Sequence, residues 1–199
     1  HDMRWFYNNR EWTKDIDNNF DLIFGCMSHP VDLVRWYLGD IEEVQAYGDI
    51  SSIAKNNDFN KMDTFTVNLK AKNGKTARVL GLYGLEHIHS FTPWIQCTLY
   101  GEKGTYQGMY PQLKSISKFE NEEEKIEGYF EDVYHYFQYE GINHHAGEFI
   151  NYTEYFAKCL HENEVAMPNI EDGYKTIATL EAIRLSIKEN RIVKVSEVL

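Results

Sequence analysis

The chain has 199 residues, of which 43% are hydrophobic and 15% aromatic, so a sizeable core can form. Its formal net charge of −11 argues against nucleic acid or an anionic membrane as a partner, because both would require clustered lysine and arginine. No apolar run approaches the roughly 18 residues that a membrane span needs. Three widely spaced cysteines without a CxxC pair favour a reducing cytoplasm over a disulfide framework or a zinc site.

The domain organisation is expected to be simple. The sequence shows no internal repeat, no low-complexity segment and no linker rich in proline, glycine or serine. We therefore expect a single domain over residues 1–199. The opening residues, HDMRWFYNNREW, match neither a signal peptide nor a transit peptide and lack an initiating methionine, which indicates a piece of a longer, cytoplasmic protein.

The first part of the chain predicts two strands followed by a helix. Residues through Gly25 read as a strand, a polar loop and a second apolar strand. The next segment, 28–40, is predicted to be a helix, because Pro30 suits a first turn and Gly39 suits a helix end. Its apolar residues also recur at helical spacing, at Val31, Val34 and Leu38.

The middle of the chain predicts antiparallel strands. Apolar and polar residues alternate through 65–70, and Asn73-Gly74 is the strongest hairpin signal in the chain. The Gly-Glu-Lys-Gly sequence at 101–104 predicts a second hairpin. The acidic segment 120–128 is predicted to be a solvated turn between a further pair of strands.

The end of the chain predicts two helices and a short strand. Apolar residues of the first helix, which begins near His144, fall along one face at Phe149, Tyr152, Phe156 and Leu160. Along the second helix, one face is predicted to carry Tyr174, Ile177, Leu180 or Glu181, Arg184 and Ile187. Residues 191–199 close as a short strand. The order predicts an α+β fold of two layers, in which an open, mostly antiparallel sheet has helices packed on one face.

His29 lies where the predicted strand meets the predicted helix. If Pro30 is the first helical residue, His29 is the N-cap, where the helix dipole disfavours a protonated imidazole. A neutral imidazole at that place could accept or donate a proton. The alternative is a partly buried histidine that bonds to the backbone, and the residues alone favour this structural interpretation.

Other polar residues give weaker signals. Asp32 and Arg35 are spaced to form an ion pair on one helix face, which we interpret as structural. A metal site is a further alternative, with ligands drawn from Glu86, His87, His89, His144 and His145. Their spacing matches no specific metal motif, so we expect no metal.

Aromatic residues could line a sugar pocket or belong to the core; these are Trp5, Tyr83, Trp94 and Tyr110. We take Trp5 and Trp94, together with His89 and His144, as the candidate substrate-binding residues. No glycine fingerprint follows a strand and no P-loop occurs, so this chain is expected to bind no cofactor itself.

Three segments resemble the C-terminal domain of the Gfo/Idh/MocA family of nicotinamide-dependent oxidoreductases. The first, HPVDLVRWYLGDIEEVQA, contains the family's histidine, aspartate, Arg-Trp pair and glycine, here His29, Asp32, Arg35-Trp36 and Gly39. The second, EDGYKTIATLEAIRLSIKENRIVKV, is similar to the family's terminal helix and strand. The third, LYGEKGTYQG, fits its mid-sheet hairpin.

The resemblance implies a two-domain enzyme. A Rossmann domain outside this chain would bind NAD or NADP. This chain would be the substrate-binding and oligomerisation domain, inactive alone and forming a dimer or tetramer through the open sheet face. The substrate would be a sugar, inositol or related polyol, and the family's catalytic histidine corresponds to His29.

One position departs from the family pattern. Many members have an aspartate four residues before the histidine, and this chain has Gly25 there. A non-catalytic, ligand-binding or regulatory member of the same fold is therefore an alternative. A metal-dependent isomerase or hydrolase built on the histidine group is a weaker one.

Overall fold

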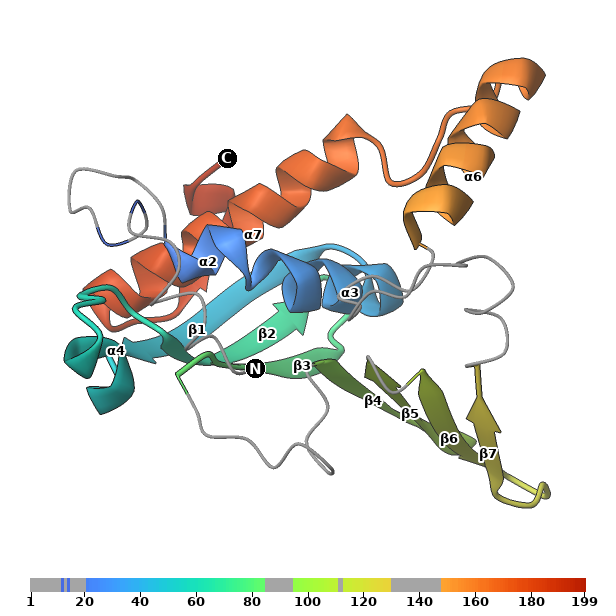
Figure 1. Ribbon diagram of the computed structural model, residues 1–199, viewed down its shortest axis with the longest axis horizontal. Coiled ribbons are helices and arrows are strands. Elements are labelled where there is room, and N and C mark those ends of the chain that lie inside the picture. The colour runs from blue at the N-terminus through green and yellow to red at the C-terminus, as the bar shows by residue number, and fades with distance from the viewer. Residues whose placement is uncertain (1–11, 13, 15–20, 85–94, 111–112, 130–147) are drawn as a thin grey trace. The chain divides into compact units, whose positions relative to one another are not determined.

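The computed structural model describes residues 12, 14, 21–84, 95–110, 113–129 and 148–199. The chain divides into two compact units, unit 1 (His1–His87 and Pro168–Leu199) and unit 2 (Ile88–Met167). Figure 1 shows the elements, which in chain order are α2 (Leu22–Gly25), α3 (Ser28–Leu38), β1 (Ile41–Asp49), α4 (Ser52–Asn56), β2 (Thr64–Ala71), β3 (Thr76–Leu82), β4 (Ile95–Gly101), β5 (Gly104–Tyr110), β6 (Lys114–Phe119), β7 (Lys125–Gly128), α6 (Glu148–Glu162), α7 (Ile170–Glu189), β8 (Val193–Lys194) and the 3-10 helix η2 (Val195–Glu197).

Unit 1 is built on an antiparallel sheet of four strands in the order β3-β2-β1-β8. Alternate residues of β2 are buried, from Phe65 to Ala71, while the residues between them lie on the opposite face. The Asn73-Gly74 turn joins β2 to β3, and Gly74 has a φ of 83°, a value that glycine adopts without strain. The hairpin prediction is therefore confirmed.

Helices α2, α3 and α7 cover one face of this sheet, as Figure 1 shows. The core lies between the two layers, and its largest fully buried side chains are Leu22, Ile23, Met27, Phe59, Phe65, Leu69, Leu180 and Ile183. The α+β prediction, with helices on one face of an antiparallel sheet, is confirmed.

The first prediction to fail concerns Leu22–Gly25, which form helix α2 and not a strand. The Asp21 side chain caps this helix by accepting a hydrogen bond of 2.9 Å from the Phe24 amide. Leu22 and Ile23 are both fully buried. Two consecutive buried residues look the same in a short helix and in a strand buried on both faces, so the apolar run alone misled the prediction.

Helix α7 packs against β1 through small side chains, and this corrects the face predicted for it. Tyr174, Ile177 and Arg184 are exposed. The buried residues are Thr176, Ala178, Thr179, Leu180, Ala182, Ile183 and Ser186. The buried side of α7 thus combines two large apolar residues, Leu180 and Ile183, with short side chains that let the helix approach the strand, so large apolar residues alone do not mark it.

Strand β8 is only two residues long. Beyond its end, a side chain of α7 makes the hydrogen bonds that link β1 to the residues before β8. Glu43 and Val44 of β1 pair with β8. Further along β1, the Ala46 amide donates to Ser186 Oγ at 3.0 Å, and Ser186 donates to the carbonyl of Arg191 at 2.5 Å. The serine hydroxyl thus bridges two backbone groups that would bond to each other directly if the pairing of β1 with β8 continued.

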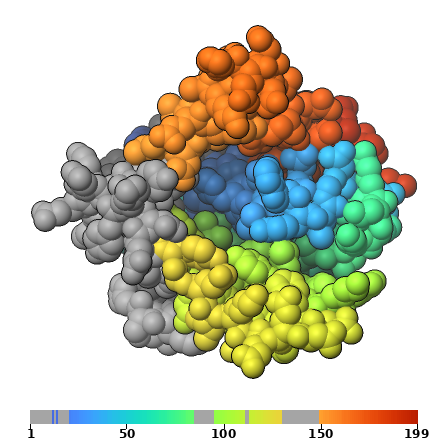
Figure 2. Space-filling view, turned by 90° about the vertical axis from the view of Figure 1, so that its right-hand side faces the viewer, coloured from blue at the N-terminus to red at the C-terminus, as the bar shows by residue number. Residues whose placement is uncertain are grey.

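Unit 2 contains a second antiparallel sheet, in the order β4-β5-β6-β7. The Gly101 to Gly104 turn joins β4 to β5, as predicted. Of the segment 120–128, predicted to be a turn, residues 120–124 form an exposed turn, whereas Lys125–Gly128 form strand β7. The yellow surface of the β6–β7 hairpin faces the viewer in Figure 2. The described strands therefore form two four-stranded sheets and not one continuous meander.

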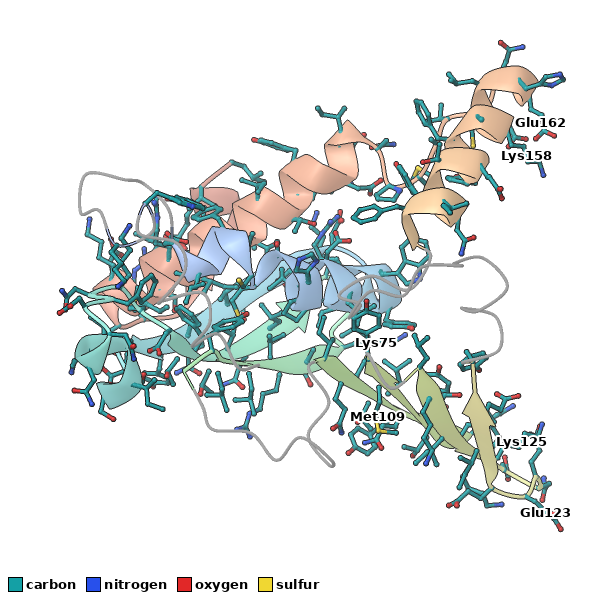
Figure 3. The ribbon with its side chains drawn as sticks, in the orientation of Figure 1. Lys75, Met109, Glu123, Lys125, Lys158 and Glu162 are labelled. Carbon is teal, nitrogen blue, oxygen red and sulfur yellow. The ribbon has the colours of Figure 1, made fainter. Side chains whose placement is uncertain are left out.

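Helix α6 also belongs to unit 2, and its predicted apolar face is exposed. Phe149, Tyr152, Phe156 and Leu160 are each at least 45% exposed. Figure 3 shows Lys158 and Glu162 close together on this helix, where they form an ion pair of 3.9 Å. No helix within the described ranges is both long enough and apolar enough to cross a membrane.

Candidate functional site

His29 occupies the first turn of α3, and its side chain is exposed. The predicted N-cap position is wrong, because α3 begins at Ser28 and its N-cap is Met27. The chain reaches α3 from the helical residues of α2, and Met27 itself has helical angles of −69° and −14°. The helix therefore starts earlier than an approach from an extended strand would allow. Pro30 still lies in the first turn, as predicted.

The residue four positions before His29 is also exposed. Gly25 is the last residue of α2 and is exposed to solvent. An aspartate at this position would therefore have room for its side chain at the surface. Helix α3 ends as predicted: Gly39 has a φ of 83° and its amide donates to the Arg35 carbonyl at 2.8 Å.

Arg35 connects α3 to the beginning of α7. It is only 8% exposed, and its Nη1 donates to Thr176 Oγ1 at 2.6 Å and to the Asp172 carbonyl at 2.8 Å. Its Nη1 lies 3.6 Å from Asp32 Oδ1, which confirms the predicted ion pair. A buried guanidinium is stable only when such partners compensate its lost hydration. Among the described side chains, Arg35 Nε is the one buried polar atom without a hydrogen-bond partner.

The Thr176 hydroxyl is the centre of this group. It accepts from Arg35 and donates to Asp32 Oδ1 at 2.6 Å. Thr176 is 6% exposed. Its single donor and one of its lone pairs are therefore directed to two charged groups of α3, in a place with little water to replace them.

Asp40, directly after α3, extends the charged group toward the surface. Its carboxylate lies 3.4 Å from Arg35, 3.5 Å from Lys175 and 3.7 Å from Lys72. Partial burial would raise the pKa of Asp40, but the Arg35 hydrogen bond and the two lysine charges outweigh it and lower that pKa below its ordinary value. The pKa of Lys175 is raised, first by its hydrogen bond to Glu171 and then by the charge of Asp40.

The other predicted site residues have different outcomes. The four substrate-binding candidates, Trp5, His89, Trp94 and His144, lie outside the described residues, as do Glu86, His87 and His145. Tyr83 is a core residue: burial raises its pKa, the nearby Cys26 adds to this, and its ring meets Phe65 edge-on at 6.2 Å. Over the part of the chain that the structure describes, no three His, Cys, Asp or Glu residues could together hold a metal ion.

Sequence reasoning missed Thr176 and Asp40. Asp32 and Arg35 were found because they lie three residues apart, whereas Thr176 follows Arg35 by 141 residues. No local pattern distinguishes this threonine from others on α7.

The first turns of α3 and α7 do not have the features of a dinucleotide site. At α7, the Asn169 side chain accepts from the amides of Glu171 and Asp172, so these donors are already used. Two carboxylates in that turn would also repel a pyrophosphate. The turn of α3 has no glycine that would let a phosphate approach its backbone.

The fold is shared with solved structures of oxidoreductases. A structure of an oxidoreductase from Agrobacterium radiobacter, in complex with NAD+, L-tartaric acid and magnesium, is similar with a TM-score of 0.75 at 18% identity. The match covers 87% of this chain and 49% of that one. Levoglucosan dehydrogenase, in complex with NADH and levoglucosan, matches with a TM-score of 0.68 at 17% identity, over 92% of this chain and 55% of that one.

A third structure, aldose-aldose oxidoreductase from Caulobacter crescentus complexed with glycerol, matches with a TM-score of 0.64 at 16% identity, over 84% of this chain and 45% of that one. A search of curated proteins gave no match. This chain spans about half the length of the solved structures it matches.

The family is identified by a match of the sequence to a family model. A model of the oxidoreductase family, C-terminal alpha/beta domain, matches residues 2–195. The chain therefore belongs to the Gfo/Idh/MocA oxidoreductase family as its C-terminal domain.

Proposed function

We propose that this chain is the substrate-binding and oligomerisation domain of a longer NAD(P)-dependent oxidoreductase that acts on a sugar, inositol or related polyol. The observation that carries the proposal is His29, an exposed imidazole in the first turn of a helix whose other side is anchored in the core. The family match over residues 2–195 supports the reaction class, and relatives crystallised with levoglucosan or NADH support the substrate class and the cofactor.

In this proposal the chain supplies proton transfer and the walls of the substrate site. When bound by the other domain, a nicotinamide cofactor supplies hydride transfer. His29 takes the proton of the substrate hydroxyl during oxidation, or returns it during reduction. Trp5, His89, Trp94 and His144 stay predictions for the substrate site, based on residue type. Residues 1–199 alone are proposed to be inactive and to act as one domain, although they contain two compact units.

The test replaces His29 in the full-length enzyme and includes a matched histidine. Levoglucosan, myo-inositol and D-glucose are assayed with NAD and NADP, and the best pair is used for all variants. We expect His29→Ala to lower kcat by about 10²- to 10⁴-fold, the usual contribution of a general acid–base group, with unchanged cofactor affinity. His161→Ala, an exposed histidine on α6, is the control and should keep kcat. A normal kcat in His29→Ala would refute the catalytic assignment.

The second candidate is a non-catalytic, ligand-binding member, and Gly25 is the observation that favours it. No turnover with any substrate of the panel would support this candidate. Gly25→Asp restores the carboxylate that many members carry before the histidine. Activity that appears in Gly25→Asp but not in the parent protein would indicate loss of an ancestral polyol dehydrogenase.

We further propose that the open face of the unit 1 sheet forms the oligomer interface and that the protein is cytoplasmic. Tyr47, Thr66 and Leu80 lie in one cross-strand row on this face, and Tyr47 and Leu80 are more than half exposed. An antiparallel sheet with helices on one side leaves the other side free to contact a partner subunit. The three cysteines are all free, which agrees with a reducing compartment.

A further inference from the structure

We propose that Thr176 and Asp32 are positioning residues for His29. Through their hydrogen bond, the first turn of α3 is tied to α7, so that the imidazole keeps one orientation toward the substrate. This inference rests on the proposed function, because it assumes that the orientation of His29 matters for turnover.

The first turn of α3 has no side-chain cap. The N-cap Met27 makes no side-chain hydrogen bond to the turn. Apart from Asp32, the fixed points are apolar: Met27 and Val31 are fully buried, and Met27 packs on β3 where Gly81 leaves room for its sulfur. Uncapped helix ends fray unless tertiary contacts hold them. His29 is exposed within this turn, so its own side chain cannot provide that hold.

Asp32 supplies the polar contact on the side of the turn nearest to His29. Residues three apart on a helix lie on the same side of it, so Asp32 and His29 share one side of α3. Its Oδ1 accepts from Thr176 Oγ1 at 2.6 Å and lies 3.6 Å from Arg35 Nη1. The Asp32 side chain is 45% exposed, but both partners are buried.

Thr176 is the member of the group that can be changed with least ambiguity. It carries no charge, yet its hydroxyl joins Asp32 and Arg35 at the same time. Valine has the same shape without the hydroxyl, so Thr176→Val removes both contacts and leaves the packing between α3 and α7 nearly unchanged. Arg35 keeps the Asp172 carbonyl and Asp40 as partners.

Thr179 provides the matched control. It is on the same helix, 1% exposed, and its hydroxyl donates to the Lys175 carbonyl of its own helix at 2.9 Å. Thr179→Val therefore removes a buried hydroxyl from α7 without breaking a bond to α3. Thr176→Ser keeps the hydroxyl and removes only the methyl group, so it tests whether the hydroxyl is sufficient for the effect.

The experiment measures kcat, KM, melting temperature and hydrogen exchange on the full-length enzyme for these three variants and His29→Ala. We expect Thr176→Val to lower kcat by about 10- to 100-fold, the range that a misplaced catalytic group can cost, with KM nearly unchanged. Exchange in the peptide covering residues 27–36 should become about 10-fold faster. Thr176→Ser should recover most of both values, and Thr179→Val should resemble the parent in both.

Equal kcat and equal exchange in Thr176→Val and Thr179→Val would overturn the inference, as would a kcat loss that Thr176→Ser does not recover. Failure of the proposed function gives a different result. If His29→Ala keeps its kcat, that function fails, while faster exchange in Thr176→Val alone would still show that Thr176 holds the turn.

Discussion

Ser186→Ala removes a single oxygen atom, and we expect it to lower the free energy of unfolding of unit 1 substantially. Ser186 is fully buried on α7, and its Oγ bridges the Ala46 amide and the Arg191 carbonyl. The register of β1 with β8 pairs Val44 with Val193, so a longer ladder would pair Gln45 with Ile192 and then Ala46 with Arg191. Ser186→Ala leaves these two backbone groups without their shared partner.

The magnitude follows from the surroundings of the two groups. Ala46 is 2% exposed, so its amide cannot reach water easily, and a buried donor without a partner costs about 1–3 kcal/mol. Arg191 is exposed, so its carbonyl can bind water at little cost. We therefore expect the free energy of unfolding to fall by about 2 kcal/mol, nearly all from the amide.

The assay combines urea denaturation, followed by circular dichroism, with hydrogen exchange at the Ala46 amide. Exchange at Ala46 should become faster than at its neighbours on β1. The control is Ser196→Ala, an exposed serine in η2, which should stay within about 0.5 kcal/mol of the parent. A loss below about 0.5 kcal/mol in Ser186→Ala, with Ala46 still protected, would refute this reasoning and would mean that the two strands close and pair directly.

Two further expectations concern charge and assembly. The pKa of Asp40 is lowered in the folded state, so its contribution to stability is complete above the ordinary value of 3.8 and is lost as pH falls through the lower, folded pKa. The melting temperature of Asp40→Asn should therefore fall less steeply with acidification than that of the parent. An identical dependence on pH would contradict the assignment. Leu80→Asp should convert the proposed oligomer to monomers in light scattering, because it buries a charge at the proposed interface. Leu199→Asp, at an exposed residue outside the sheet, should not, and an oligomer that survives Leu80→Asp would exclude this face.

The sequence predicted elements well wherever the signal is local. The end of α3 at Gly39 and the turn at Asn73-Gly74 both require a positive φ, which glycine adopts without strain. Glycine at these positions is therefore a signal that can be read from the local sequence alone. The start of α3 was misplaced because it depends on α2, whose cap at Asp21 is recognisable only once the following residues are known to be helical. An error in one element thus moved the boundary of the next.

The buried face of α7 could not be predicted from periodicity. Ile177 is large and apolar but 49% exposed, whereas Thr176, Thr179 and Ser186 are buried. Periodicity rules place large apolar residues inside, but a helix held close to a strand requires small ones, with their hydroxyls satisfied. Which hydroxyls are satisfied depends on Arg35, Asp32 and Ala46, which are distant in sequence.

The long separation between Arg35 and its partners also has a consequence for folding during synthesis. Thr176 and Asp172 follow Arg35 by 141 and 137 residues, so the ribosome delivers the tether to α3 long after it has made α3 itself. Until then Arg35 is a charged side chain without the buried environment that it later occupies. Contacts of such long range form late, and chains that wait for them are exposed to misfolding and proteolysis. A nascent chain that stops before residue 170 would therefore carry His29 on a helix whose first turn lacks the α7 partners that hold it in the folded protein.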